Sequence, residues 1–388
     1  MKDKIAFVCQ RYGLEVNGGA EAECRMYAER LTDDYDVEVL TTCALDYTDW
    51  ANSYPAGISE INGVTVRRFP VERPREQKQF DAISQEVIRD NHSDEAEERW
   101  MDAQGPYSPA LVDFLARHGM DYHAVLFMTY LYFTTVRGIA QKCWKKILIP
   151  TAHDEWPIYQ RQFRRVFQNA DMLIYNSGGE KRFVEKLFPS ARSKPHVIAG
   201  AGVVPQDKPL PDVRERYGFR GTYICYCGRI DESKGCGLLF DYFGRYKKKR
   251  PGDVKLVLTG KAAMEIPRGD SVISLGFVSE EEKLAIMKNA AAFVIASEYE
   301  SLSIVVLESM MMGRPVLVNG KCEVLKDHCL MSNAGLYFYD YREFEGELDY
   351  LLSHKREALA MGENGKRYVR ENYQWDTIIE KIHGLISE

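Results

Sequence analysis

A regular alternation of short β-branched runs with helix-periodic segments extends along almost all of this 388-residue sequence, and it constrains the fold more than any other feature. Strands separated by helices pair in parallel, because each helix returns the chain to the same end of the sheet. The alternation therefore predicts an α/β fold with parallel sheets. The expected strands are 4–10, 37–42, 64–69, 124–128, 146–150, 172–175, 196–198, 223–227, 255–259, 272–275, 292–296 and 315–318.

The alternation is interrupted by a glycine- and proline-rich segment at 200–205, which Pro209 and Pro211 follow closely. Glycine and proline at this density punctuate a fold rather than build its elements, and the chain is longer than one average domain. We therefore expect a linker here between two doubly wound domains. Such sheets bind ligands beyond the carboxyl ends of their strands, which predicts a cleft between facing domains. The charged segment 91–117 indicates a partly helical insertion in the first domain.

Charge and hydropathy argue against two classes of protein. The net charge is −6 and the pI about 5.9, whereas a nucleic-acid binder usually carries a strong basic excess. The longest apolar runs, such as 290–296, are far too short to span a bilayer. The basic run 247–250 ends an expected helix, where the helix dipole favours cations. We therefore prefer a solvated surface there to peripheral membrane contact.

No charged-then-apolar leader opens the sequence, so we expect a cytoplasmic protein, with the inner face of the membrane as the alternative location. The nine cysteines are scattered without a CxxC pair, which favours free thiols in a reducing compartment. Cys322, His328 and Cys329 lie close together in sequence, and metal ligation by them is the alternative interpretation. We expect no obligate metal.

The segment 296–316 carries the clearest chemistry, because Glu300 and Glu308 lie at the start of an expected helix that Gly313 ends. A carboxylate accepts hydrogen bonds from the vicinal hydroxyls of a ribose or hexose, and the free N–H groups near 301–303 form an anion site. The helix is apolar nearly all round, so Glu308 needs a partner or a polar cleft. An ordinary helix-surface glutamate is the alternative.

A second motif, 227–235, follows the first strand of the second domain and contains Arg229 and Lys234. Fixed cations stabilise the charge that develops on a diphosphate leaving group. Arginine holds oxygens in a fork, whereas lysine acts as a point charge. A solvated loop is the alternative, but the position of this motif ahead of the glutamate pair favours a diphosphate site.

Two further motifs follow strand ends of the first domain, where cleft residues lie in such sheets. Gly18 and Gly19, within 17–21, allow a close backbone approach to a ligand at a helix N-terminus; a simple tight turn is the alternative. They do not form the GxGxxG fingerprint of a dinucleotide site. His153 follows the strand 146–150, and Asp154 and Glu155 beside it are candidates to hold an acceptor hydroxyl or to tune it. A structural histidine is the alternative.

Together these motifs resemble the retaining glycosyltransferases of family 4, the glycosyl transferases of group 1. These enzymes have the GT-B fold, which is α/β with two facing Rossmann-like domains, parallel sheets and an inter-domain cleft. Glu300 and Glu308 match the family's two glutamates separated by seven residues, and 228–235 is similar to its Gly-Arg…Lys-Gly motif. The resemblance implies an acceptor-side domain at 1–203 and a donor domain at 204–373. It also implies a last helix, at about 374–388, that packs back on the first domain.

The resemblance implies a role for each donor-side residue. Glu300 contacts the donor sugar hydroxyls and Glu308 the nucleotide ribose, while Arg229 and Lys234 neutralise the diphosphate. Phe277 follows the strand 272–275 and lies beside the nucleotide base. On the other side, His153 lies near the transferred sugar, and the Gly18-Gly19 loop lies at the donor phosphate and the acceptor.

The chain departs from the family pattern after Glu300, where the family often has an aromatic residue and a glycine and this chain has Leu302 and Ser303. The amides of Leu302, Ser303 and Ile304 are still expected to hold the donor phosphate and sugar. The sugar preference of the family cannot be transferred to this chain.

The predicted function is transfer of a sugar from a nucleotide-diphosphate donor to an acceptor hydroxyl, with retention, in bacterial-type glycan or glycoconjugate assembly. A UDP-sugar is favoured over a GDP-sugar, and no obligate cofactor is expected. The acceptor, whether a glycan, a lipid-linked molecule or a protein, is not specified. The alternatives are a non-catalytic nucleotide-sugar-binding subunit that supports a partner transferase and a GT-B nucleotide-sugar epimerase. A phosphorylase would need pyridoxal phosphate and a dedicated lysine, which the sequence does not identify.

Overall fold

The computed structural model describes residues 2–16, 18–89, 91–206 and 209–388. The chain divides into two compact units. Unit 1 comprises Met1–Ala201 together with Ile378–Glu388, and unit 2 comprises Gly202–Thr377. The division falls within the segment 200–205, where the glycines and prolines predict a linker.

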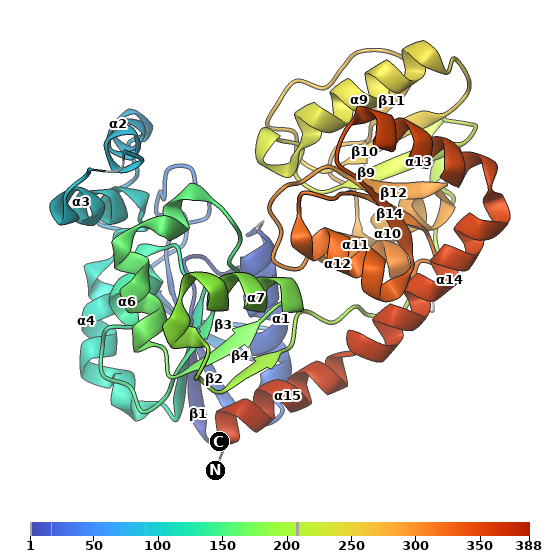
Figure 1. Ribbon diagram of the computed structural model, residues 1–388. Helices are drawn as coiled ribbons and strands as arrows, with labels where there is room; N and C mark the ends of the chain where they lie inside the picture. Colours follow the sequence, from blue (N-terminus) through green and yellow to red (C-terminus); the bar gives the residue numbers. More distant parts are fainter. Residues whose placement is uncertain (1, 17, 90, 207–208) are drawn as a thin grey trace. The chain divides into compact units, whose positions relative to one another are not determined.

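Unit 1 contains an eight-stranded sheet in the order β3-β4-β2-β1-β5-β6-β7-β8, with helices against it (Figure 1). All neighbouring strands pair in parallel except β3 and β4. The strands are β1 (Lys4–Val8), β2 (Asp36–Thr42), β3 (Gly57–Ile61), β4 (Val64–Phe69), β5 (Ala124–Met128), β6 (Lys146–Ile149), β7 (Met172–Tyr175) and β8 (His196–Ile198). The parallel α/β organisation predicted from the alternation is confirmed in this unit.

The helices of unit 1 pack an apolar core against this sheet, with Phe127 and Leu148 of the strands facing Trp100 and Phe163 of the helices. The helices are α1 (Gly19–Leu31), α2 (Gln77–Val87), α3 (Asp94–Gln104), α4 (Pro109–His118), α5 (Phe133–Gly138), α6 (Arg161–Asn169) and α7 (Gly178–Leu187). Short 3₁₀ turns are η1 (Gly119–Asp121), η2 (Trp156–Tyr159) and η3 (Pro189–Ala191). The insertion predicted at 91–117 is formed mainly by α3 and α4.

The strand β3 is absent from the sequence prediction. It forms an antiparallel hairpin with β4 through Asn62 and Gly63, whose φ angles are 50° and 81°. Asn-Gly is the preferred pair for such a two-residue turn, because both positions need a left-handed backbone. The turn is therefore a readable signal, but β3 is mostly exposed and has no apolar alternation to mark it.

Unit 2 contains a six-stranded, wholly parallel sheet in the order β11-β10-β9-β12-β13-β14. The strands are β9 (Tyr223–Cys227), β10 (Lys255–Thr259), β11 (Val272–Ser274), β12 (Ala292–Ile295), β13 (Val316–Asn319) and β14 (Gly335–Phe338), of which β14 is absent from the sequence prediction. The helices are α8 (Val213–Tyr217), η4 (Glu232–Lys234), α9 (Cys236–Lys249), α10 (Glu280–Asn289), α11 (Ile304–Met311), α12 (Glu323–Ser332), α13 (Tyr341–Ser353) and α14 (Lys355–Asn372).

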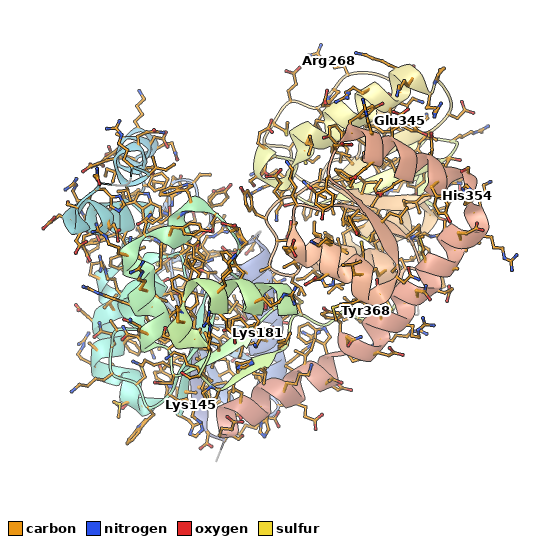
Figure 2. The ribbon with its side chains drawn as sticks, in the orientation of Figure 1. Lys145, Lys181, Arg268, Glu345, His354 and Tyr368 are labelled. Carbon is orange, nitrogen blue, oxygen red and sulfur yellow. The ribbon has the colours of Figure 1, made fainter. Side chains whose placement is uncertain are left out.

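The last helix, α15 (Trp375–Ser387), belongs to unit 1 from Ile378 onwards. Its apolar face is buried, and polar contacts fix it to the sheet region. Tyr35 Oη lies 2.9 Å from His383 Nδ1, and Lys145, labelled in Figure 2, donates through Nζ to the Ile386 carbonyl. Among the described helices, none is both long enough and apolar enough to cross a bilayer.

Within unit 2, Gly362 of α14 sets how closely this helix packs on the turn after α11. A Cβ atom at this position would lie 2.0 Å from the Gly313 carbonyl oxygen. This oxygen belongs to the backbone, so it cannot swing aside as the end of a flexible side chain can. Gly346 of α13 is also helical, but a Cβ atom at that position meets nothing within 4 Å.

We expect Gly362→Ala to destabilise unit 2 by about 1–3 kcal/mol, the usual cost of overpacking a close contact. Gly346→Ala is the matched control, and we expect it to be neutral or stabilising by roughly 0.5–1 kcal/mol, because alanine restricts the unfolded chain. Thermal unfolding of the two variants checks this. Equal midpoints for both would show that the α14 packing does not depend on Gly362.

Candidate functional site

The predicted donor-side residues Lys234 and Glu300 meet in unit 2. Lys234 Nζ donates to Glu300 Oε1 over 2.8 Å, and the two side chains are 34% and 11% exposed. They come from the loops after β9 and β12, which are neighbours in the sheet. The parallel order of the strands thus brings together two motifs that lie 66 residues apart in sequence.

The loop 228–235 is shaped by its own short contacts. Asp231 caps η4 by accepting from the Lys234 amide over 3.0 Å, and it also forms an ion pair with Arg229. Gly235 has a φ of 69°, and a Cβ atom there would lie 2.2 Å from the Ala296 carbonyl oxygen at the end of β12. Two independent constraints therefore require glycine at this position: the positive φ angle and the short distance to the Ala296 carbonyl oxygen.

The glutamate loop is held from the opposite side by a buried histidine. His328 Nε2 lies 2.8 Å from the Leu302 carbonyl oxygen, and Nδ1 lies 3.2 Å from Tyr368 Oη. Burial lowers the pKa of His328, so the neutral ring donates from Nε2 to the carbonyl and accepts at Nδ1. Tyr368 lies on α14 (Figure 2) and its hydroxyl contacts that of Tyr373 over 3.3 Å. The sequence gives no sign of this role, because the partners are distant along the chain.

Ser303, at the start of α11, has a φ of 66°, in the left-handed region that favours glycine. The family often has a glycine at this position. Ser303 therefore differs from the family in its side chain, whereas its backbone has the conformation that a glycine would favour. Ser303 is buried, and Leu302 before it is buried as well. Ile304 begins α11, whose first N–H groups have no acceptor within the helix.

The Glu308 side chain is 13% exposed and pairs with Lys283 of α10. The distances from Lys283 Nζ to Oε1 and Oε2 are 3.0 and 2.8 Å. Burial raises the pKa of Glu308, and the Lys283 ammonium acts in the opposite direction. The requirement that Glu308 have a partner was correct, but Lys283 was missed because its helix is separate in sequence. Phe277 lies on the strand-to-helix loop before α10 and is 79% exposed.

In unit 1, the space above Gly18 is taken by the chain's own Glu21. A Cβ atom at Gly18 would lie 2.0 Å from Glu21 Oε2, whereas one at Gly19 meets nothing within 4 Å. Glu21 is buried and accepts from Arg11 Nε over 2.9 Å. The group that lies close to Gly18 is therefore a carboxylate of the chain itself, and the ligand contact expected at Gly18 and Gly19 stays a prediction. Asn17 of the same motif lies outside the described residues.

His153 follows β6 and is 29% exposed, with Nε2 3.4 Å from Glu155 Oε1. The same Glu155 oxygen accepts from Tyr130 Oη over 2.7 Å, and the His153 and Tyr130 contacts hold the pKa of Glu155 below its usual value despite burial. Thr129 and Thr151, directly after β5 and near the end of β6, have φ angles of 58° and 48°. Strained backbone of this kind concentrates at functional sites.

Two buried carboxylates lie behind the His153 loop. Glu180 accepts from the amides of Ala152 and Asn176 over 2.6 Å each. Glu23 accepts from Tyr27 Oη and from Asn176 Nδ2, both over 3.0 Å. Burial raises the pKa of Glu23 to about 7 and that of Glu180 to about 8. Neither residue is predicted from the sequence.

The metal-ligand alternative for Cys322, His328 and Cys329 finds no support. His328 is engaged with Leu302 and Tyr368, and all nine cysteines are free. Across residues 2–16, 18–89, 91–206 and 209–388, no group of three or more histidine, cysteine or carboxylate side chains is placed to hold a metal ion.

Comparison with known proteins finds similarity to glycosyltransferases. Residues 214–368 match the family model described as glycosyl transferases group 1. The chain is 24% identical to the uncharacterized glycosyltransferase MJ1607 of Methanocaldococcus jannaschii, over 97% of this chain and 96% of that protein. It is 26% identical to a GDP-mannose-dependent alpha-(1-6)-phosphatidylinositol monomannoside mannosyltransferase of Mycolicibacterium smegmatis, over 60% of this chain and 66% of that protein.

The fold is shared with solved structures. The Anabaena protein HepE, in complex with UDP and glucose, superposes with a TM-score of 0.71 at 15% identity, covering 99% of each chain. The predicted GT-B fold is thereby confirmed. The chain is thus similar to glycosyltransferases, and the part of unit 2 at 214–368 matches the group 1 family model.

The Lys283–Glu308 pair predicts a strongly non-additive double-mutant cycle. Lys283→Met leaves a nearly buried carboxylate without its cation, and we expect a loss of roughly 2–4 kcal/mol in the free energy of unfolding. Adding Glu308→Gln removes the isolated charge, so the double variant should be more stable than Lys283→Met alone. Urea unfolding of the two single variants and the double variant measures the coupling. Additive losses would contradict a direct interaction between the two side chains.

The buried carboxylates predict a fall in stability with rising pH. Their folded-state pKa values, about 7 and 8, exceed the ordinary value of 4.5, so the folded protein binds their protons more tightly. The stability they contribute is complete below about pH 4.5 and is lost as the pH rises through 7 and 8. Glu23→Gln keeps the shape without the charge, and we expect it to reduce the loss between pH 5 and 8.5 by about 2–3 kcal/mol.

The measurement is the unfolding midpoint of the wild type and of Glu23→Gln between about pH 5 and 8.5. Glutamine at position 23 has partners for both of its polar atoms, because Asn176 Nδ2 is a donor and the Tyr27 hydroxyl is also an acceptor. Exposed Glu72 supplies the matched control, Glu72→Gln, which should keep the wild-type pH profile. A profile for Glu23→Gln that parallels the wild type would refute the assignment.

Proposed function

We propose that this chain transfers a sugar from a nucleoside diphosphate donor to an acceptor hydroxyl, with retention of anomeric configuration. The observation that carries the proposal is the meeting of Lys234 and Glu300, 2.8 Å apart, in a unit whose sequence matches the group 1 family. A cation for phosphate and a carboxylate for sugar hydroxyls are thus adjacent. A donor has the same two features next to each other, its diphosphate and its sugar.

The charges of the cluster suit departure of a nucleoside diphosphate. The Arg229 side chain is 40% exposed while Asp231 holds it, so its guanidinium is accessible to phosphate oxygens. Together with Lys234 it would offset the charge that develops as the sugar leaves. The amides at 302–304 would add N–H donors at the start of α11.

Glu308 is proposed to bind the nucleotide ribose. It is already paired with Lys283, and a carboxylate has several acceptor positions, so one oxygen can bond a cation while another accepts a hydroxyl. Exposed Phe277 is proposed to lie against the base. We favour a UDP-sugar, since the structural relative HepE is in complex with UDP and glucose. A GDP-sugar is the other candidate, because a sequence relative is GDP-mannose-dependent.

On the acceptor side, His153 is proposed to contact the transferred sugar, with Glu155 and Tyr130 setting the orientation of its ring. The Gly18-Gly19 loop is proposed to contribute backbone to the same function. The buried Glu180 holds the amide next to His153 and would act as a positioning residue. No metal is assigned to the reaction, and full activity in a chelator would support this.

Donor binding tests the proposed site. A panel of UDP- and GDP-sugars is screened by thermal shift, where a ligand at a hundred times its Kd stabilises by about 2.7 kcal/mol. We expect one donor to raise the unfolding midpoint and Arg229→Ala and Glu308→Ala to abolish the rise. The controls Arg268→Ala and Glu281→Ala remove exposed charges of unit 2 and should leave it intact.

Donor turnover then tests the chemistry. The anomer released by slow donor hydrolysis is read by proton NMR before it mutarotates, and retention predicts the donor's own configuration. Wild-type donor affinity in both Arg229→Ala and Glu308→Ala would refute the site. Binding without transfer or hydrolysis would instead favour a non-catalytic subunit, and donor conversion into a different nucleotide-sugar would favour an epimerase.

A further inference from the structure

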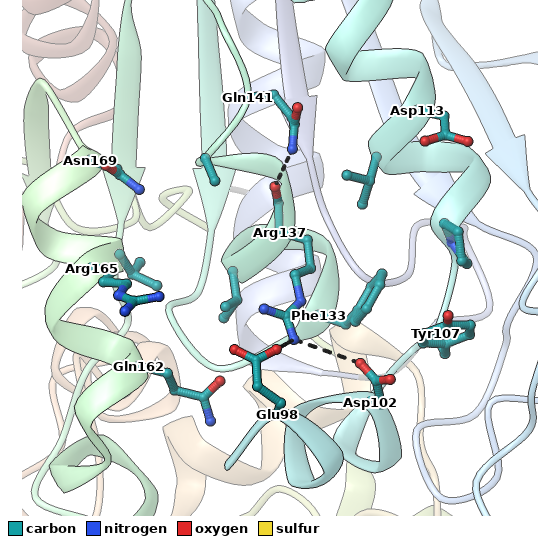
Figure 3. A pocket seen from close by; sticks show the side chains of 15 residues that line it. Glu98, Asp102, Tyr107, Asp113, Phe133, Arg137, Gln141, Gln162, Arg165 and Asn169 are labelled. Atoms are coloured by element: carbon teal, nitrogen blue, oxygen red, sulfur yellow. Dashed lines mark hydrogen bonds and ion pairs between the residues drawn. The ribbon is translucent and has the colours of Figure 1, made fainter. Parts of the chain in front are cut away.

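A pocket of about 450 Å³ lies in unit 1 between α3, α4, α5 and α6 (Figure 3). Its volume falls in the range of small-molecule sites, roughly 300–1,000 Å³. None of the residues assigned above to donor or acceptor contacts lines it. Two of the helices that form it, α3 and α4, belong to the insertion at 91–117, so the pocket is a product of that insertion.

Ionic side chains of both signs line the pocket. Arg137 of α5 forms ion pairs with Glu98 and with Asp102, the latter at 3.7 Å (Figure 3). The side chains of Asp113 and Arg165 have no hydrogen bond or ion pair with any described residue. The lining therefore holds three carboxylates and two guanidinium groups. Of these, the Asp113 carboxylate remains available as an acceptor and the Arg165 guanidinium as a donor.

A buried amide oxygen adds an unsatisfied acceptor. Gln162 is 9% exposed, and its Nε2 donates to Gln160 Oε1 over 2.6 Å and to the Glu97 carbonyl over 3.3 Å. Its Oε1 has no hydrogen-bond partner among the described residues. Figure 3 shows this oxygen turned into the pocket on the side of Glu98. A buried acceptor without a partner is costly, so a donor brought to the wall of the pocket beside Gln162 would be favoured.

The remaining wall of the pocket is apolar. Val112, Phe133, Val136 and Val166 present hydrocarbon between the polar groups. The ligand that fits must therefore carry a non-polar face together with groups that both donate and accept hydrogen bonds. We propose that this pocket binds a saccharide, whose C–H face packs on the apolar wall and whose hydroxyls bridge Gln162, Asp113 and Arg165.

Other small ligands match the lining less well. The carboxylates outnumber the guanidinium groups, which disfavours a phosphate or another anion. A polyamine would leave Arg165 without an acceptor and would face two guanidinium groups. A hydroxyl both donates to Gln162 Oε1 or a carboxylate and accepts from Arg165, so one neutral ligand satisfies every open position.

Saturation-transfer NMR with the full chain, without nucleotide-sugar, tests the proposal. The probes are methyl α-D-glucopyranoside, methyl α-D-mannopyranoside, maltose and α-1,6-mannobiose, each up to about 20 mM, a concentration that is high enough to detect a Kd of about 1 mM. Ala140 is exposed at the pocket, so Ala140→Trp fills it and Ala140→Ser leaves it open. We expect at least tenfold weaker binding in Ala140→Trp and Arg165→Ala, and wild-type binding in Ala140→Ser.

The test is independent of the proposed function, because donor recognition is assigned to unit 2. All three variants should keep the wild-type unfolding midpoint and, where a donor has been found, its thermal shift. Equal saccharide binding by Ala140→Trp would overturn the proposal. So would the absence of binding by all four probes, or binding in the pocket of inorganic phosphate or spermidine in their place.

Discussion

The contact between Gly235 and the end of β12 is the constraint on which the candidate site of unit 2 depends. A Cβ atom at Gly235 would lie 2.2 Å from the Ala296 carbonyl oxygen, so only glycine lets the two loops meet. Asn319 Nδ2 donates to the same carbonyl over 2.9 Å, which fixes the end of β12 from the adjacent strand. Lys234 directly precedes the contact and therefore reaches Glu300 without further rearrangement. The ion pair between Lys234 and Glu300 therefore depends on the backbone contact between Gly235 and Ala296.

Near this contact, a chain of hydrogen bonds within unit 2 holds the glutamate loop in place. His328 holds the Leu302 carbonyl, and Tyr368 and Tyr373 hold His328, so the glutamate loop is tied to the end of α14. These groups are buried and neutral, which keeps the loop position insensitive to salt and to pH near neutrality. Glu308 has a different support, a partly exposed lysine on a neighbouring helix. The two glutamates of one motif are thus positioned by independent means.

The parallel α/β organisation was predictable because continuous apolar runs mark strands that are buried on both faces, and the inner strands of both sheets are such runs. Exposed β3 has no such pattern, and β14 was passed over because it is a short segment beginning with glycine. For the site, short motifs together with their resemblance to the family indicated Arg229, Lys234 and Glu300, and the structure brings Lys234 and Glu300 together. The supports Lys283 and His328 could not be found in the same way, since a partner contributed by a distant element leaves no spacing in the sequence. Glu23 and Glu180 look like ordinary helix carboxylates until their burial is known.

The placement of α15 determines the order in which this molecule completes itself on the ribosome. Residues Ile378–Glu388 belong to unit 1, yet they are synthesised after all of Gly202–Thr377. The sheet of unit 1 therefore emerges early while Tyr35 and Lys145 still lack His383 and Ile386. Unit 2 is contiguous and completes first, so a nascent chain carries a complete unit 2 while unit 1 still lacks its last helix. The apolar residues of α15, Ile378, Ile382, Leu385 and Ile386, are buried in the finished structure, so the unit 1 surface that they cover stays exposed to solvent until synthesis ends.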